Sequence, residues 1–219
     1  ALENIAINGK EDPDLDHIRF DDAKTYELLG RGDTLGVFQL DGGPMRQLLR
    51  SMQPDCFEDI SAVGALYRPG PMGADSHNKY ARRKTGREKV EPIHPELAEA
   101  LEPILGETYG LIVYQEQVMA IAQQLAGYTL GAADMLRRAM GKKKHEVLMS
   151  QRETYMKGTR ENGIDDALAE KIFDLLTHFA DYGFNKSHSA AYALVAWQTA
   201  YLKAHYPQEF MAAMLTSIM

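Results

Sequence analysis

The chain has 219 residues, with 24 lysines and arginines against 31 aspartates and glutamates, a formal net charge of −7. This length can bury one good-sized core or two small ones. The acidic total argues against a sequence-independent nucleic-acid coat, which depends on contacts of lysine and arginine with phosphate.

Cysteine content and hydropathy narrow the class of protein further. Cys56 is the only cysteine, which excludes an internal disulfide and a cysteine-based zinc site and fits the reducing cytoplasm. The apolar run at residues 190–197 is far shorter than the roughly 20 residues that span a bilayer. We therefore expect a cytoplasmic protein without a membrane partner. The absence of an initiator methionine and the apolar helical pattern at the C-terminus predict a piece of a longer protein.

Short elements fill the start of the chain. Residues 1–24 are polar and irregular, and Asp22 can cap a helix over residues 23–29. The apolar run at 35–40 lies between turn signals and predicts a short strand. A Gly-Pro pair then begins the helix "MRQLLRSM", because the missing N–H of proline is harmless in a first turn.

The middle of the first half is rich in proline and charge. Asp55 and Glu58 have the spacing of a capping box ahead of "DISAVGALY". The prolines of "YRPGPMG" predict a stiff loop. Residues 73–95 predict a charged surface loop, whose basic side chains we interpret as solvated: Arg82, Arg83, Lys84 and Arg87.

The second half of the sequence predicts a series of helices. Residues 109–114 predict a strand, and the apolar spacing that follows predicts a helix stopped by Gly127. The next stripe is Leu130, Ala133, Leu136 and Met140. One further helix ends near residue 162, another carries apolar residues from 168 to 179, and a last long helix breaks at Pro207. The predicted fold class is mainly α with a few short strands.

The stretch "DMLRRAMGKKK" concentrates five cations in eleven residues. Arg137 and Arg138 follow Leu136 directly, so at 3.6 residues per turn they flank the buried seam of their helix. Gly141 should end that helix, with three lysines on its last turn: Lys142, Lys143 and Lys144. The helix dipole favours lysines there, but it does not explain two adjacent arginines. On these residues alone, a solvated basic face and a contact with polyphosphate or nucleic acid remain equally open.

A second polar block, "NKSHSAAY", begins the last long helix. A serine–histidine pair adjacent in sequence is rarely oriented as nucleophile and base, and no nucleophile elbow surrounds it. Ser187 or Ser189 can be the N-cap of the helix. The block can also be a polar turn that contacts a ligand, and the two interpretations are compatible because helix N-termini favour phosphate.

Two other groups have a structural and a functional interpretation. Arg68 stands at the start of "RPGP", either in a purely structural turn or as a positioned phosphate contact. The alternating aspartates of "DPDLD" resemble magnesium ligands, but Pro13 and its polar surroundings favour a flexible loop. The histidines show no metal-ligand spacing, so we expect no metal site.

Several long blocks together resemble a known family. "GVFQLDGGPMRQLL", "MQPDCFEDISAVGALYRPGPMG", "YGLIVYQEQVM", "GYTLGAADMLRRAMGKKK" and "FNKSHSAAYALVAWQTAYLKAHYPQEFMAAMLTS" are similar to the α subunits of bacterial DNA polymerase III, the C-family replicative polymerases. The resemblance runs from about Thr25 to the C-terminus. The segments "ETYGLIVYQEQV" and "GRGDTLGVFQLDGGPM" resemble the corresponding segments of actinobacterial members.

The resemblance implies an irregular multi-helix fingers domain at residues 25–219, with subregions 25–108 and 109–219, after a linker at 1–24. It implies a DNA-directed DNA polymerase, a nucleotidyltransferase, whose palm lies upstream and holds Mg²⁺ on its aspartates. The present chain would then contain no catalytic residue and would be inactive alone. Implied partners are primer–template DNA, deoxynucleoside triphosphates, the palm and thumb, and the replisome with its sliding clamp. The alternative is a non-enzymatic helical module that binds nucleic acid.

The resemblance also implies roles for the polar residues. Arg137 and Arg138 would contact the triphosphate or the terminal base pair, and the three lysines would attract triphosphate or template phosphates. Tyr182 or Tyr192 would stack on base or sugar. The full set of expected nucleotide- and DNA-binding residues is Arg68, Arg137, Arg138, Lys142, Lys143, Lys144, Asn185, Lys186, Ser187, His188 and Tyr192.

Overall fold

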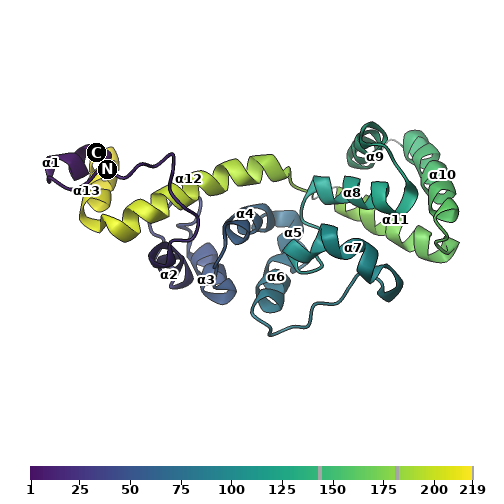
Figure 1. The fold of residues 1–219 in the computed structure, drawn as a ribbon, viewed down its shortest axis with the longest axis horizontal. Helices are drawn as coiled ribbons and strands as arrows, with labels where there is room; N and C mark the ends of the chain where they lie inside the picture. Colours follow the sequence, from purple (N-terminus) through teal and green to yellow (C-terminus); the bar gives the residue numbers. More distant parts are fainter. Residues whose placement is uncertain (143–144, 181–182, 219) are drawn as a thin grey trace. The chain divides into compact units, whose positions relative to one another are not determined.

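The computed structural model describes residues 1–142, 145–180 and 183–218. These residues form thirteen α-helices and two short 3₁₀ helices (Figure 1). In this described part the only β-type pairing is an isolated parallel bridge between Tyr114 and Phe184. The mainly α fold class is therefore confirmed, and the few short strands that we expected are wrong.

The chain divides into two compact units. The first consists of Ala1–Glu88 with Ser187–Met219, and the second of Lys89–Lys186. The helices of the first unit are α1 (Leu2–Ile7), α2 (Ala23–Gly30), α3 (Gly43–Met52), α4 (Phe57–Leu66), α5 (Pro69–Gly73), α6 (Ser76–Lys84), α12 (Lys186–His205, whose first residue belongs to the second unit) and α13 (Pro207–Ile218).

Local sequence signals explain helices α2 and α3. The carboxylate of Asp22 accepts a hydrogen bond from the Thr25 N–H at 2.8 Å, which confirms the predicted cap of α2. Helix α3 has proline in its first turn, as predicted. Its buried residues recur three and four positions apart, at Met45, Leu48, Leu49 and Met52.

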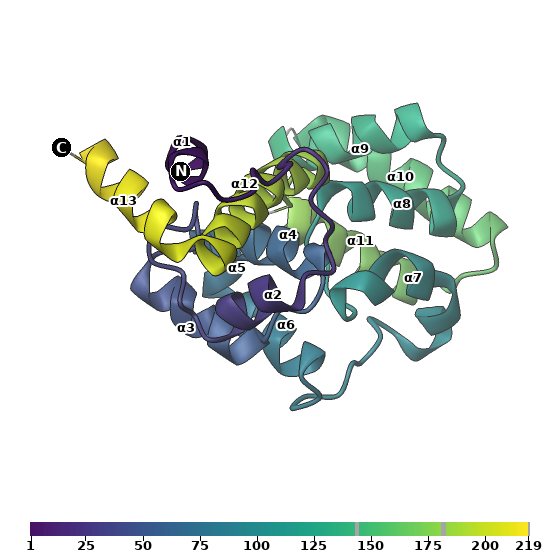
Figure 2. The same cartoon turned by 60° about the vertical axis from the view of Figure 1, so that its left-hand side comes forward.

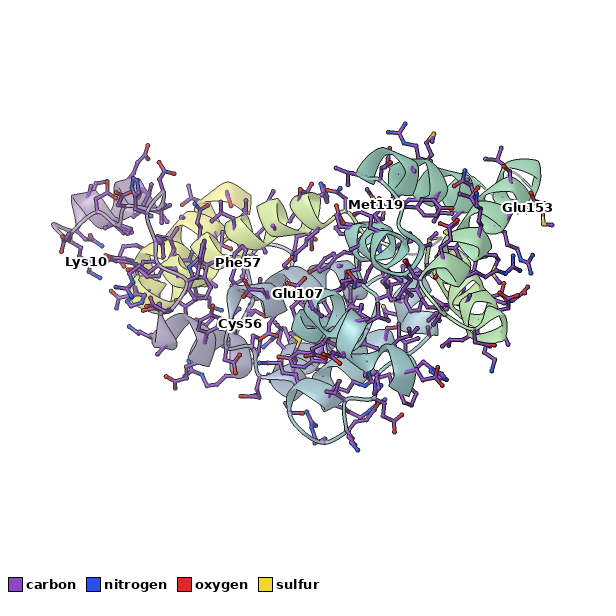
Figure 3. All side chains as sticks on the ribbon, turned by 45° about the vertical axis from the view of Figure 1, so that its right-hand side comes forward. Lys10, Cys56, Phe57, Glu107, Met119 and Glu153 are labelled. Atoms are coloured by element: carbon purple, nitrogen blue, oxygen red, sulfur yellow. The ribbon has the colours of Figure 1, made fainter. Side chains whose placement is uncertain are left out.

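A buried carboxylate joins the two ends of the chain in the first unit. Helices α1 and α13 lie side by side (Figures 1 and 2). Glu209, in the first turn of α13, accepts hydrogen bonds at 2.7 Å from Asn8 and from Lys10, which is labelled in Figure 3. The Glu209 side chain is fully buried. The hydrogen bond from Lys10 is the main reason that the pKa of Glu209 falls to about 2.

The second unit has its own apolar core. Its elements are two 3₁₀ helices, η1 (Pro95–Leu97) and η2 (Gly106–Thr108), and the α-helices α7 (Ala98–Leu105), α8 (Gln115–Ala126), α9 (Leu130–Lys142), α10 (His145–Glu161) and α11 (Asp166–Ala180). Apolar residues from all five α-helices form one buried cluster. Helix α8 ends as predicted at Gly127, whose φ of 67° is in the left-handed region that glycine adopts readily.

Both predicted strands are turns or irregular segments. In residues 35–40, positive φ angles at Gly36 and Gln39 and a hydrogen bond from the Thr34 hydroxyl to the Leu40 carbonyl close a compact turn. In residues 109–114, the side-chain oxygen of Gln117 accepts the N–H groups of Val113 and Tyr114 at 2.8 and 3.0 Å. A side chain therefore satisfies the donors that a neighbouring strand would have paired.

Three predictions about the proline- and charge-rich segment are also wrong. Residues 69–73 form helix α5, because the first proline occupies a helix position where no N–H is needed. Residues 76–84 form helix α6 within the expected loop. The N-cap of α4 is Cys56, without a side-chain cap, and the Asp55 N–H bonds instead to Asp59 at 3.1 Å. In addition, α1 lies within the stretch that we expected to be irregular.

Candidate functional site

The two adjacent arginines of α9 share one carboxylate. Nη2 of Arg137 lies 2.7 Å from Oδ1 of Asp134, and Nε of Arg138 lies 2.8 Å from Oδ2 of the same residue. Ala133, Leu136 and Met140 are buried on the core side of α9. The arginines flank this seam as predicted, with 24% of the Arg137 side chain and 64% of the Arg138 side chain exposed.

The positive charge of Arg137 and Arg138 is incompletely balanced by their described contacts. The hydrogen bonds from Arg137 and then Arg138 lower the pKa of Asp134, so the carboxylate stays ionised at neutral pH. It offers one negative charge to two guanidinium groups. Helix α9 is described as far as Lys142, so Gly141 lies inside the helix and does not end it as we expected. Lys143 and Lys144 lie outside the described residues, as does Tyr182.

The turn before α12 is fixed to the N-terminus of α8. Phe184 exchanges backbone hydrogen bonds with the segment before α8: its N–H donates to Val113 at 3.1 Å, and its carbonyl accepts from Gln115 at 2.9 Å. The Glu116 carboxylate accepts from the Asn185 amide at 2.9 Å and from the Lys186 N–H at 3.0 Å. A carboxylate from another helix therefore satisfies the first N–H of α12.

The side chain of Lys186 is held within the same unit. Its ammonium group bonds to Glu107, which is labelled in Figure 3. It also lies 5.6 Å from the ring centre of Tyr114. Lys186 is therefore an ordered cation whose side chain is 44% exposed.

Gln115 connects Arg137 of α9 to the turn before α12. Its side-chain oxygen accepts from Nη1 of Arg137 at 3.2 Å, and its side-chain nitrogen donates to the Gly183 carbonyl at 3.0 Å. Sequence reasoning missed both Gln115 and Glu116 as site residues. The available signal was a pair of polar residues at the start of a predicted helix, directly after the apolar run "GLIVY".

Three expected site residues lie in the first unit, on the first turns of α12. Ser187 and His188 are exposed, and 43% of Tyr192 is exposed. The ring of Tyr192 lies 4.3 Å from that of His188 and 5.6 Å from that of Phe38, measured between ring centres. The three rings form an exposed aromatic row.

The predicted serine N-cap of α12 is wrong. The helix begins at Lys186, so Ser187 and Ser189 both lie inside it. Ser189 is buried, and its hydroxyl donates to the Ser61 carbonyl at 2.6 Å. Its position is therefore explained by packing against α4.

Arg68 is a helix-start residue of the first unit. It is the N-cap of α5, with the extended backbone that a residue before proline requires. Its Nε donates to the Ala65 carbonyl at 3.0 Å. Burial lowers the pKa of its guanidinium.

The basic residues of α6 form ion pairs with acidic neighbours. Arg82 and Arg83 both pair with Glu88, at 2.8 and 3.2 Å. Lys84 lies 2.9 Å from Asp59, and its side chain is only 6% exposed. Arg83 is buried as well, so the interpretation of this cluster as solvated surface is wrong for Arg83 and Lys84. Arg87 bonds to the backbone and side chain of Ser51.

The ammonium group of Lys84 also lies beside the carboxylates of a group of possible metal ligands. In the part of the chain that the structure describes, one such group, Asp55, Cys56 and Asp59, has its ligand atoms within 4.8 Å of one another. The Lys84 ammonium lies 2.6 Å from Asp55 and 2.9 Å from Asp59. Burial is the main reason that the pKa of Cys56 rises to about 12, which disfavours the thiolate that binds metals. The ammonium group of Lys84 therefore balances the negative charge of Asp55 and Asp59, as a metal ion otherwise would.

The structure thus links four of the expected residues within the second unit: Arg137, Arg138, Asn185 and Lys186, through Asp134, Gln115 and Glu116. In the first unit it places His188 and Tyr192 in one aromatic row, beside Ser187 in the chain. Among the described residues, no helix has the length and apolar character needed to cross a membrane.

Comparison with known proteins identifies the family. Residues 1–163 match the bacterial DNA polymerase III alpha subunit finger domain. The whole chain is 60% identical to DNA polymerase III subunit alpha of Mycobacterium tuberculosis strain H37Rv, of which it covers 18%. Identity is 61% with the Saccharopolyspora erythraea protein, over 99% of the chain and 18% of that protein. It is 54% with the Escherichia coli K12 protein, over all of the chain and 19% of that protein.

These identities agree with the resemblance to actinobacterial members, since the two actinobacterial proteins are the more similar of the three. The chain spans about a fifth of the length of these relatives. The chain belongs to the finger-domain family of bacterial DNA polymerase III alpha subunits.

Proposed function

We propose that this chain is the fingers region of a DNA-directed DNA polymerase, and that it binds the incoming deoxynucleoside triphosphate and the primer–template. The observation that carries the proposal is the sharing of Asp134 by Arg137 and Arg138. It orients two guanidinium groups near the middle of α9 and leaves them with one carboxylate. Phosphoryl transfer needs mainly positioning and electrostatic stabilisation from protein, and arginine suits bidentate phosphate contact.

The ion pairs with Asp134 do not prevent such binding. Surface ion pairs three or four residues apart on a helix contribute little to stability, because water screens them. A triphosphate carries several negative charges and can replace one carboxylate at the arginines. Asp134 would then hold the guanidinium groups in place before the nucleotide arrives.

Lys186 and Asn185 would add contacts from the turn before α12. Lys142, Lys143 and Lys144 would attract triphosphate or template phosphates, and Arg68 would contact DNA phosphate. The aromatic row of the first unit suits a separate task, because exposed rings stack on bases or sugars. Tyr192 and His188 would supply that surface, with Ser187 as a polar neighbour.

Magnesium, which such polymerases use, does not fit the described residues of this chain. The Asp55 group is occupied by Lys84, and Asp134 and Glu116 are bound to arginine and to the α12 turn. Among the described residues, the one group of three possible ligands whose ligand atoms lie within 4.8 Å of one another is therefore already occupied by an ammonium group. We propose that the palm, outside this chain, holds the metal, and that this chain does not extend a primer alone.

Single-nucleotide incorporation by the full-length polymerase tests the role of the arginines. Arg137→Ala combined with Arg138→Ala should lower kcat/KM for the nucleotide by about 100-fold or more. The matched control is Arg160→Ala, which removes an exposed arginine of the same unit whose partner is Asp166. A double variant that performs within threefold of this control would refute the proposal.

Two assays test the remaining parts. Incubation of this chain alone with primer–template, magnesium and all four deoxynucleotides should give no extension, and robust extension would refute the proposal that the metal is held outside this chain. The alternative, a non-enzymatic nucleic-acid module, predicts duplex binding by the full-length protein that weakens with salt by a log–log slope of about −0.9 per phosphate. That alternative also predicts no competition by free triphosphate, whereas our proposal predicts competition.

A further inference from the structure

Gln115 makes the one described hydrogen bond that joins Arg137 to another helix. The guanidinium of Arg137 also bonds to Asp134, but that residue lies on α9 itself. The bond from Nη1 to the Gln115 oxygen, at 3.2 Å, is the contact that fixes the arginine relative to α8. The orientation of Arg137 relative to the rest of its unit therefore depends on this amide.

The same amide also holds the turn before α12. Its nitrogen donates to the Gly183 carbonyl at 3.0 Å, while its own backbone N–H donates to Phe184 at 2.9 Å. The next residue, Glu116, binds Asn185 and Lys186. One dipeptide at the start of α8 thus contacts both groups that we assign to the nucleotide.

The amide suits this position because it is a donor and an acceptor at once. A carboxylate could accept from Arg137 but could not donate to a carbonyl, and an ammonium group could do only the reverse. Close packing at Gly183, whose missing Cβ would lie 3.1 Å from Cγ of Gln115, restricts where the side chain can lie. A glutamine at this position therefore supplies both hydrogen bonds from one side chain.

We propose that Gln115 is a positioning residue that couples Arg137 to the 183–186 turn, so that both groups meet the phosphates of one nucleotide in a fixed relative geometry. The proposal rests on the proposed function. It adds a residue that does not itself touch the nucleotide but sets the arrangement of those that do.

A double-mutant cycle in the full-length polymerase tests the coupling. The variants are Gln115→Met, which keeps the length of the side chain but removes both bonds, Arg137→Ala, and the two combined. Gln124→Met is the matched control, because Gln124 is an exposed glutamine of the same helix. The measurements are kcat and KM for single-nucleotide incorporation, together with hydrogen exchange of α8 and α9.

Gln115→Met should lower kcat/KM for the nucleotide about 10- to 100-fold, as expected for loss of a hydrogen bond to a charged group. In the Arg137→Ala background the same change should cost less than threefold. Gln115→Glu keeps the acceptor for Arg137 but loses the donor to Gly183, so it should remain impaired. Hydrogen exchange of α8 should match that of Gln124→Met.

Three results would overturn the coupling: kinetics of Gln115→Met equal to those of the control, an effect that adds fully to that of Arg137→Ala, or full activity of Gln115→Glu. In each case Arg137→Ala alone shows whether the proposed function survives. If Arg137→Ala is itself without effect, the proposed function fails first.

Discussion

Gly158→Ala should loosen the contact between α8 and α10, although alanine is normally the better helix former. A Cβ at position 158 would lie 2.1 Å from the carbonyl oxygen of Ala126 and 2.8 Å from its carbonyl carbon. Both obstacles are backbone atoms at the end of α8, so no side chain can rotate away. One helix would have to move by about 1 Å to relieve the contact.

The magnitude follows from two opposing effects. Replacing glycine by alanine inside a helix contributes about 1 kcal/mol of stability. Overpacking typically costs about 1–3 kcal/mol and occasionally more, and a backbone obstacle belongs at the upper end of that range. We expect a net loss of about 1–2 kcal/mol in local stability, equivalent to a roughly 5- to 30-fold larger equilibrium constant for opening of the two helices.

Hydrogen–deuterium exchange of α8 and α10 in the full-length polymerase measures this loss directly. Gly131→Ala is the matched control, since position 131 is helical and a Cβ there would meet nothing within 4 Å. The control should exchange at the wild-type rate or more slowly. If Gly158→Ala protects α8 and α10 as well as wild type does, the close approach of the two backbones is refuted.

Two further predictions concern buried charges. Lys84→Met leaves the fully buried carboxylate of Asp59 without its ammonium partner and should destabilise α4 and α6 by about 3–5 kcal/mol. The control is Lys157→Met, which changes a side chain that is 78% exposed. It should leave hydrogen exchange of its own helix unchanged. Equal exchange in the two variants would contradict the burial of the pair. For Glu209, the folded-state pKa of about 2 lies below the ordinary 4.5, so its contribution is complete above about pH 4.5 and is lost as the pH falls towards 2. Exchange of α1, corrected for intrinsic pH dependence, should rise over that window in wild type but not in Glu209→Gln, and a flat wild-type profile would refute the assignment.

Local signals predicted the elements that depend on neighbours in the sequence. The cap at Asp22 and the end of α8 at Gly127 are set within one turn of chain, so both were predictable. The flanking positions of Arg137 and Arg138 follow from the helical angle alone. Their pairing with Asp134, three and four residues earlier, could also have been predicted from spacing.

What the sequence could not supply was information about distant partners. The apolar run at 109–114 has the composition of a strand, but a strand needs a neighbour, and the Gln117 side chain satisfies its donors instead. Lys84 looked like a surface cation because its partner Asp59 lies far from it in the sequence. The bond between Gln115 and Arg137 joins residues from two helices, so periodicity within one helix could not reveal it.

The first unit is assembled from both ends of the chain, with Lys89–Lys186 inserted between them. A ribosome makes the chain from its N-terminus, so the second unit leaves the exit tunnel before Ser187–Met219 does. The order of folding therefore differs from the order of synthesis. The inserted unit can finish folding first, whereas Ala1–Glu88 can complete its unit only after Ser187–Met219 has emerged. Nascent chains halted when Lys186 has just left the exit tunnel should accordingly resist protease in the inserted unit while the earlier residues are still cleaved.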